Sequence, residues 1–116
     1  MDLSIVLTED ERHACRRAGV HVRGIAAGLS GSSQKDAAAC ERYASTLESV
    51  SQSADPVQLQ ANEKIHIEQA SFLLEGIRNG LDNADLDTAA SLVQRDIERL
   101  NDLVFRYNSE AGRRVV

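Results

Sequence analysis

Tryptophan is absent from the 116-residue sequence, and phenylalanine and tyrosine together supply only four residues. Proline occurs once, at Pro56. Domains rich in β-structure usually contain more aromatic and branched residues than this, and proline inside a helix breaks it. The scarcity of both residue types, together with abundant alanine, favours a helical protein.

Two cysteines, Cys15 and Cys40, are too few for a disulfide scaffold. No apolar run approaches the roughly 20 residues that cross a bilayer, and the first residues lack the basic region of a signal peptide. These absences argue against a secreted miniprotein or a membrane protein and predict a cytoplasmic location. The net charge of −5 argues against direct nucleic-acid binding. Arginine outnumbers lysine eleven to two, which is typical of a GC-rich genome such as that of many bacteria and phages.

The length fits a single helical domain that spans residues 1–116. Apolar residues at alternating spacings of three and four predict four helices, because this spacing places side chains on one helix face. The short apolar N-terminal arm is expected to be extended, or a strand, and to pack onto a neighbour. The predicted helices cover about residues 9–28, 33–53, 56–80 and 86–108, with the arm at 1–7 and a frayed tail at 110–116.

Capping signals mark two of the predicted helix starts. Thr8 is followed three residues later by Glu11, which is the pattern of a capping box. Asp55 offers an N-cap before Pro56 at the first helical position, so a helix is expected from Pro56 onward.

Three glycines interrupt the first predicted helix. Gly19 leaves open whether this helix ends early, because glycine often follows a helix C-terminus. Gly24 and Gly28 are four residues apart, and we expect them to let two backbones approach closely.

The third and fourth predicted helices keep their apolar stripes for three turns or more and are joined by a short loop. They are expected to form an antiparallel hairpin. The predicted fold class is therefore all-α: a four-helix bundle, or a long antiparallel helical hairpin with a smaller two-helix appendage. The wide apolar faces of this hairpin predict a homodimer or higher oligomer. The third stripe is Ile67, Ala70, Leu74, Ile77 and Leu81, widened by Ile65, Phe72 and Leu73, and the fourth begins at Leu86.

The residue types that usually carry catalysis or bind metals do not form a known motif in the sequence. Cys15 and Cys40 lie on apolar stripes and are expected to be buried, reduced thiols. Glu63 and His66 match half of a di-iron motif, without a second pair at a matched position. The sequence has no nucleophile elbow, no zinc-protease helix motif and no phosphate-binding loop. We therefore expect no catalytic residues, no metal and no cofactor.

The segment His21-Val22-Arg23-Gly24, followed by Ile25-Ala26-Ala27-Gly28-Leu29, is similar to the signature of histidine phosphotransfer domains. That family consists of helical bundles of about this length, and its pattern is histidine, any residue, an apolar residue, lysine and glycine. One residue of the pattern is missing between His21 and Gly24. The resemblance covers about ten residues, and it implies that His21 accepts a phosphoryl group.

Acidic residues dominate the middle of the chain. Residues 43–92 contain two basic and eight acidic residues, which gives a net charge of −6. Glu68, Glu75 and Asp82 recur at intervals of seven and are a candidate surface for a protein partner. A solvated acidic face without a partner is the alternative.

Basic residues cluster in the first predicted helix, and their spacing places several close to one line. Guanidinium groups bind phosphate and carboxylate through paired hydrogen bonds. The cluster is therefore a candidate site for a phosphorylated small molecule, a nucleotide or an acidic partner. Pairing with acidic residues of the same chain, or across a dimer, is the alternative. The cluster consists of Arg12, His13, Arg16, Arg17, His21 and Arg23.

These observations favour a small non-enzymatic regulator, adaptor or inhibitor that acts through protein–protein contacts. The first alternative is a ligand-binding helical oligomer that holds a phosphorylated small molecule or nucleotide at the basic helix face. The second alternative is a histidine phosphotransfer-like module. No membrane partner is expected.

Overall fold

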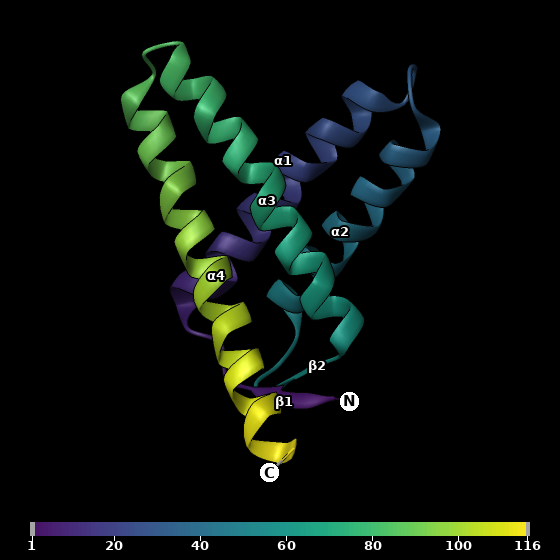
Figure 1. Cartoon of the computed structure of the whole chain (residues 1–116), viewed down its shortest axis with the longest axis vertical. Helices are drawn as coiled ribbons and strands as arrows, with labels where there is room; N and C mark the ends of the chain where they lie inside the picture. The colour runs from purple at the N-terminus through teal and green to yellow at the C-terminus, as the bar shows by residue number, and fades with distance from the viewer. Residues whose placement is uncertain (1, 116) are drawn as a thin grey trace.

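The protein folds into two helical hairpins joined at a two-stranded sheet (Figure 1). The computed structural model describes residues 2–115. The predicted all-α fold is confirmed. In chain order, the elements are β1 (Leu3–Ile5), α1 (Glu9–Leu29), α2 (Gln34–Gln52), β2 (Val57–Leu59), α3 (Ala61–Asn83) and α4 (Asp87–Val115).

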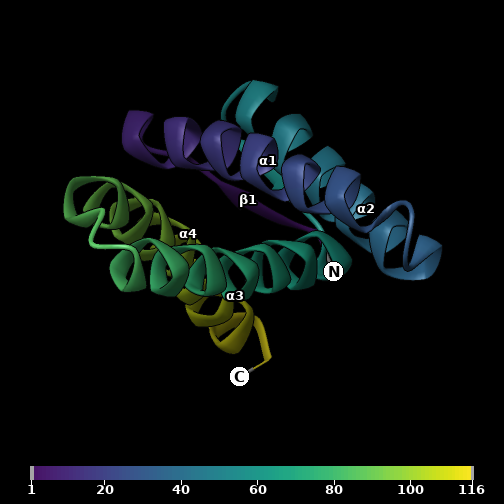
Figure 2. The same cartoon turned by 90° about the horizontal axis from the view of Figure 1, so that it is seen from above.

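The two hairpins form the arms of a V, and the sheet lies near its base (Figure 1). Seen from above, the α1–α2 hairpin and the α3–α4 hairpin form two stacked layers (Figure 2). Each layer consists of helices adjacent in sequence, as their short connections require. The chain order thus repeats a strand–helix–helix unit, although the sequence shows no internal repeat.

The N-terminal arm forms a strand, and the neighbour it packs onto is β2. The two strands pair antiparallel, with Leu3 opposite Leu59 and Ile5 opposite Val57. All four of these side chains are buried. Between them, the exposed Gln58 donates a hydrogen bond from Nε2 to Oγ of Ser4 at 2.8 Å. The alternation of buried and exposed residues matches a strand with one face on the core.

The predicted start of the third helix at Pro56 is wrong. The Asp55–Pro56 peptide bond is cis, and the next residues form β2 rather than a first helical turn. The helix begins at Ala61, where the backbone N–H of Gln60 donates to Oε1 of Glu63 at 2.8 Å. The apolar residues of β2 alternate, and their pairing with β1 decides this segment's structure.

The first helix continues through Gly19, and the fourth extends past its predicted end. An added Cβ at Gly19 would lie 3.5 Å from the carbonyl oxygen of Ala44, so this glycine lies against α2. Apart from the neighbouring backbone of α1 itself, no atom of the described residues lies within 4 Å of such a Cβ at Gly24 or Gly28, so these two do not mediate the expected backbone approach. Residues 110–115, predicted to be frayed, continue α4; residue 116 lies outside the described residues.

The core lies between the two hairpin layers and over the sheet. Every helix and both strands contribute to one buried apolar cluster. The α3–α4 hairpin predicted from the stripes is confirmed. Ile65, Phe72 and Leu86, which the stripes assigned to the apolar face, are exposed. The largest fully buried side chains are Leu3, Leu47, Leu59, Ile67, Leu74, Ile97, Leu100 and Leu103.

Candidate functional site

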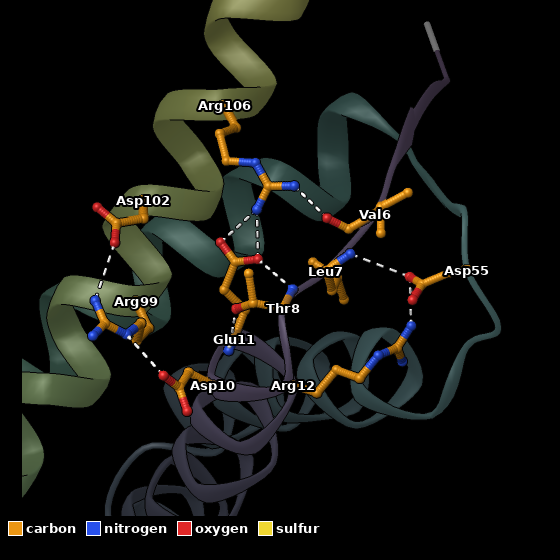
Figure 3. Close-up of polar contacts among 10 residues, drawn as sticks. All are labelled: Val6, Leu7, Thr8, Asp10, Glu11, Arg12, Asp55, Arg99, Asp102 and Arg106. Carbon is orange, nitrogen blue, oxygen red and sulfur yellow. Dashed lines mark hydrogen bonds and ion pairs between the residues drawn. The ribbon is translucent and has the colours of Figure 1, made fainter.

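The basic residues of α1 point to several different parts of the molecule. Arg12 donates from Nη1 to the carbonyl oxygen of Ser53 at 2.6 Å and from Nη2 to Oδ1 of Asp55 at 2.6 Å. The same Asp55 oxygen accepts a hydrogen bond from the backbone N–H of Leu7 at 3.2 Å (Figure 3). Arg12 therefore fastens the segment between α2 and β2 to the start of α1.

Two further arginines of the cluster pair with carboxylates. Arg17 forms a bidentate pair with Asp96 of α4, and this hydrogen bonding raises the pKa of Arg17. Arg23 binds Glu48 at 2.8 Å and Glu41 at 2.5 Å, both on α2. The hydrogen bond from Arg23 lowers the pKa of Glu48. The charges of these two arginines are therefore neutralised by carboxylates of the same chain.

The remaining members of the cluster make local contacts or none. Arg16 lies 2.5 Å from Nδ1 of His13, whose Nε2 lies 3.4 Å from Glu9. Nδ1 of His21 is enclosed and lacks a hydrogen-bond partner among the described residues, and the side chain is half-buried. The structure therefore does not gather the six basic residues into one open site, and the phosphotransfer alternative gains no support from the position of His21.

A buried carboxylate, which the sequence pattern marked only as part of a capping box, lies at the start of α1. Glu11 is 3% exposed, and its Oε1 accepts a hydrogen bond from the backbone N–H of Thr8 at 2.8 Å. Arg106 of α4 binds both carboxylate oxygens of Glu11, at 2.5 and 2.6 Å, and the carbonyl oxygen of Val6 (Figure 3). The predicted capping box is confirmed. The signal for burial was in the sequence, because Glu11 lies four residues before Cys15 on the apolar stripe.

The acidic residues of α3 lie at two separate hollows. Glu68 and Glu75 line a groove of about 370 Å³ between α3 and α4, which we call the outer groove. Asp82 lies at a different hollow, nearer the α3–α4 loop, beside Arg78. The structure therefore brings together two of the three predicted acidic residues. The outer groove is lined by Glu68, Ser71, Phe72, Glu75, Asn101, Val104, Phe105 and Asn108.

Two exposed phenylalanines distinguish the outer groove. Phe72 of α3 and Phe105 of α4 are each 72% exposed. Within the groove, Oγ of the buried Ser71 donates to Oδ1 of Asn101 at 2.8 Å, which ties the two helices together. From the sequence, Phe72 was assigned to an apolar stripe facing the core, and Phe105 was assigned no role.

Phe105 also lines a second hollow, of about 330 Å³, between β1 and the last turns of α4. Val6, which is also largely exposed, contributes to this hollow. Arg106 and Arg113 border it, but their charges are paired with Glu11 and Glu110. The apolar surface of the outer groove therefore extends past Phe105 toward the N-terminal arm.

Histidine, cysteine and acidic residues form no cluster of three or more suited to a metal ion within residues 2–115. His66 lies 2.7 Å from Oγ1 of Thr46 and packs against the ring of Tyr43, while Glu63 caps α3. Cys15 and Cys40 are both buried, free thiols, as predicted.

Comparison of the chain with protein-family models, with curated protein sequences and with solved structures finds no match. None of the helices in the described part of the chain has the length and apolar character to cross a membrane. The function is therefore inferred from the surfaces described above.

Proposed function

We propose that this protein is a small, non-enzymatic interaction module, acting as a regulator, adaptor or inhibitor in the cytoplasm. Its partner binds the outer groove through a segment that is both apolar and basic. The observation that carries this proposal is the exposure of Phe72 and Phe105 in one groove whose lining includes Glu68 and Glu75.

The aromatic pair supports the choice of this surface. Exposed phenylalanine side chains leave large apolar areas in water, and aromatic residues are enriched among those that dominate binding energy. A groove between two antiparallel helices suits a third helix, whose apolar residues at spacings of three and four enter the groove. The apolar surface near Val6 lengthens the available contact.

The charge of the surface favours a basic partner. Residues 43–92 have a net charge of −6, and a basic segment would be steered toward such a surface. Glu75 makes no hydrogen bond or ion pair with the described residues, whereas Glu68 pairs with Lys64 at 2.7 Å. Glu75 is therefore available to pair with a cation of the partner.

A second copy of the chain fits this surface less well. In a two-fold symmetric dimer, both subunits present the same patch to each other. That arrangement would bring the acidic residues of one groove close to those of the other. The homo-oligomer inferred from the sequence stays a prediction, and the experiment below separates it from a different partner.

The test uses two synthetic amphipathic helices of about 18 residues, or about 27 Å. One has leucine on its apolar face and lysine elsewhere, and its matched counterpart has glutamate in place of lysine. We expect the wild-type protein to bind only the lysine peptide in fluorescence anisotropy. Phe72→Ser and Glu75→Lys should each weaken this binding about ten-fold or more.

Two matched variants outside the outer groove serve as controls. Leu92→Ser removes another exposed apolar residue of α4, and Asp36→Lys reverses an exposed acid of α2, a helix that does not line the groove. Both should bind the lysine peptide like wild type. Equal binding of the two peptides, or unchanged binding by both groove variants, would refute the proposal. A wild-type dimer in sedimentation velocity that Phe72→Ser dissociates would show that a second copy occupies the groove instead.

A further inference from the structure

A small cleft at the junction of α1 and α4 is lined only by charged residues. Its volume is about 230 Å³. Three arginines and two aspartates line it, and a third acid, Asp102, pairs with Arg99 from outside the lining. These residues come from two elements, α1 and α4. The lining residues are Asp10, Arg17, Arg95, Asp96 and Arg99.

Asp96 and Arg17 form the fixed side of the cleft. The carboxylate of Asp96 is 2% exposed and accepts hydrogen bonds from Nε of Arg17 at 3.1 and 3.2 Å and from Nη2 at 2.7 Å. A bidentate pair of this kind holds the guanidinium plane in one orientation. The third nitrogen of Arg17, Nη1, makes no hydrogen bond with the described residues.

Arg95 and Arg99 form the other side of the cleft, and only Arg99 has acidic partners. They lie four residues apart on α4, where two like charges destabilise a helix. Arg99 is 3.3 Å from Asp102 and 3.9 Å from Asp10, and both acids are largely exposed (Figure 3). Arg95 has no hydrogen bond or ion pair with the described residues. Several guanidinium N–H groups therefore remain without an acceptor at one place.

We propose that this cleft binds the phosphate group of a small phosphate monoester. A phosphate group would supply acceptors for the guanidinium N–H groups of Arg95 and for Nη1 of Arg17, and its oxygens match the planar donor pairs of guanidinium groups. The cleft has the volume of about seven or eight water molecules at about 30 Å³ each, which accommodates a phosphate and a small organic group.

A compact anion suits the site better than a nucleic acid. The arginines converge on one cleft instead of following a stripe, and the acidic surface of the rest of the chain repels a polyanion. Only Arg17 of the predicted α1 cluster takes part; Arg95 and Arg99 come from α4. The proposal uses different residues from those of the outer groove, so either can fail without the other.

The experiment measures the melting temperature by thermal unfolding and the binding affinity by calorimetry, both at constant ionic strength. The probes are inorganic phosphate, glycerol 3-phosphate and adenosine monophosphate. We expect at least one probe to bind and to raise the melting temperature of the wild-type protein. Arg95→Gln should weaken that binding about ten-fold or more, without loss of folding, because Arg95 makes no hydrogen bond or ion pair with the described residues that the substitution would remove. Arg42→Gln, which changes an exposed and equally unpaired arginine of α2, is the matched control.

The outcomes distinguish the source of the phosphate. Tighter binding of an ester than of inorganic phosphate identifies an organic ligand, and equal binding identifies the phosphate group as the whole determinant. The proposal is overturned if no probe binds, or if Arg42→Gln and Arg95→Gln weaken binding equally, which indicates general ionic screening. An oligonucleotide that binds more tightly than every probe, and loses that binding in Arg95→Gln, would also overturn it.

Discussion

Cys15 and Cys40 are both buried, yet their surroundings differ. Cys15 is fully enclosed, and burial, reinforced by the nearby charge of Glu11, raises its pKa from 9.0 to about 12. Burial also raises the pKa of Cys40, with a further contribution from Asp36 and Glu41. Thiolate is the reactive form of cysteine, so both thiols resist modification in the folded protein.

We predict that Cys15 reacts with a thiol reagent at pH 8 only when the protein unfolds globally. In Cys40→Ala, the labelling rate should follow the unfolding equilibrium as denaturant is added. In Cys15→Ala, Cys40 should label faster, because Cys40 is less completely buried than Cys15, at 5% against 0% exposed. Both thiols should react fully in denaturant. Equal, rapid labelling of the two variants in buffer would contradict this prediction.

The stability of the folded protein depends on pH through Cys15, and the direction of this dependence follows from the pKa of its thiol. The unfolded chain releases this thiol proton near pH 9.0 and the folded chain near pH 12. The folded state therefore binds the proton more tightly. The contribution of Cys15 to stability is fully present below pH 9 and is lost as the pH rises toward 12.

At the scale of helices, the glycines of α1 have opposite roles. Gly19 lies against α2, whereas Gly24 faces open space within an uninterrupted helix. Alanine at an exposed helical position is more favourable than glycine, because glycine loses more backbone entropy on folding. The sequence pattern alone did not separate these two positions.

We predict that Gly24→Ala raises the free energy of unfolding by about 0.5–1 kcal/mol. Gly19→Leu should lower it by about 1–3 kcal/mol, because a large side chain would collide with Ala44 and Leu47 of α2. Chemical denaturation followed by circular dichroism measures both changes. A destabilising effect of Gly24→Ala would show that a close contact exists at this position.

The sequence predicted most helices well because their apolar stripes and caps are local signals. Thr8 and Glu11 mark the start of α1 without reference to any other part of the chain. The segment before α3 was assigned wrongly, because Asp-Pro before an apolar residue is compatible with either a helix start or a strand. Its pairing with Leu3 and Ile5, some 50 residues earlier, decides between them, and no local pattern reports that pairing.

The candidate sites were less predictable for the same reason. The partner of Arg17 is Asp96, 79 residues away, so spacing within α1 alone cannot show that Arg17 is paired. Phe72 lies at the edge of its stripe, where the angle between α3 and α4 decides whether the side chain is buried or exposed. Sequence spacing did place Glu68 and Glu75 on one face, and the structure puts both in the outer groove.

At the scale of the whole molecule, the two strand–helix–helix units are joined by the sheet, by the core and by charged links, two of which have a buried carboxylate. One link is Arg17–Asp96 and the other is Glu11–Arg106. In both, a carboxylate that is almost fully buried meets an arginine that is partly exposed. Losing one partner of such a pair costs more than the pair itself contributes, because the other charge is left unpaired.

The contribution of these links to stability is best tested at Glu11, because its carboxylate accepts hydrogen bonds from both Thr8 and Arg106. We predict that Glu11→Gln lowers the free energy of unfolding by about 2–4 kcal/mol. Asp10→Asn, one residue away with a largely exposed side chain 3.9 Å from Arg99, should change it by less than about 0.5 kcal/mol. Urea denaturation of the two variants measures the difference. Equal effects would mean that the charge near the start of α1 matters only through the helix dipole, and that the link to α4 contributes nothing.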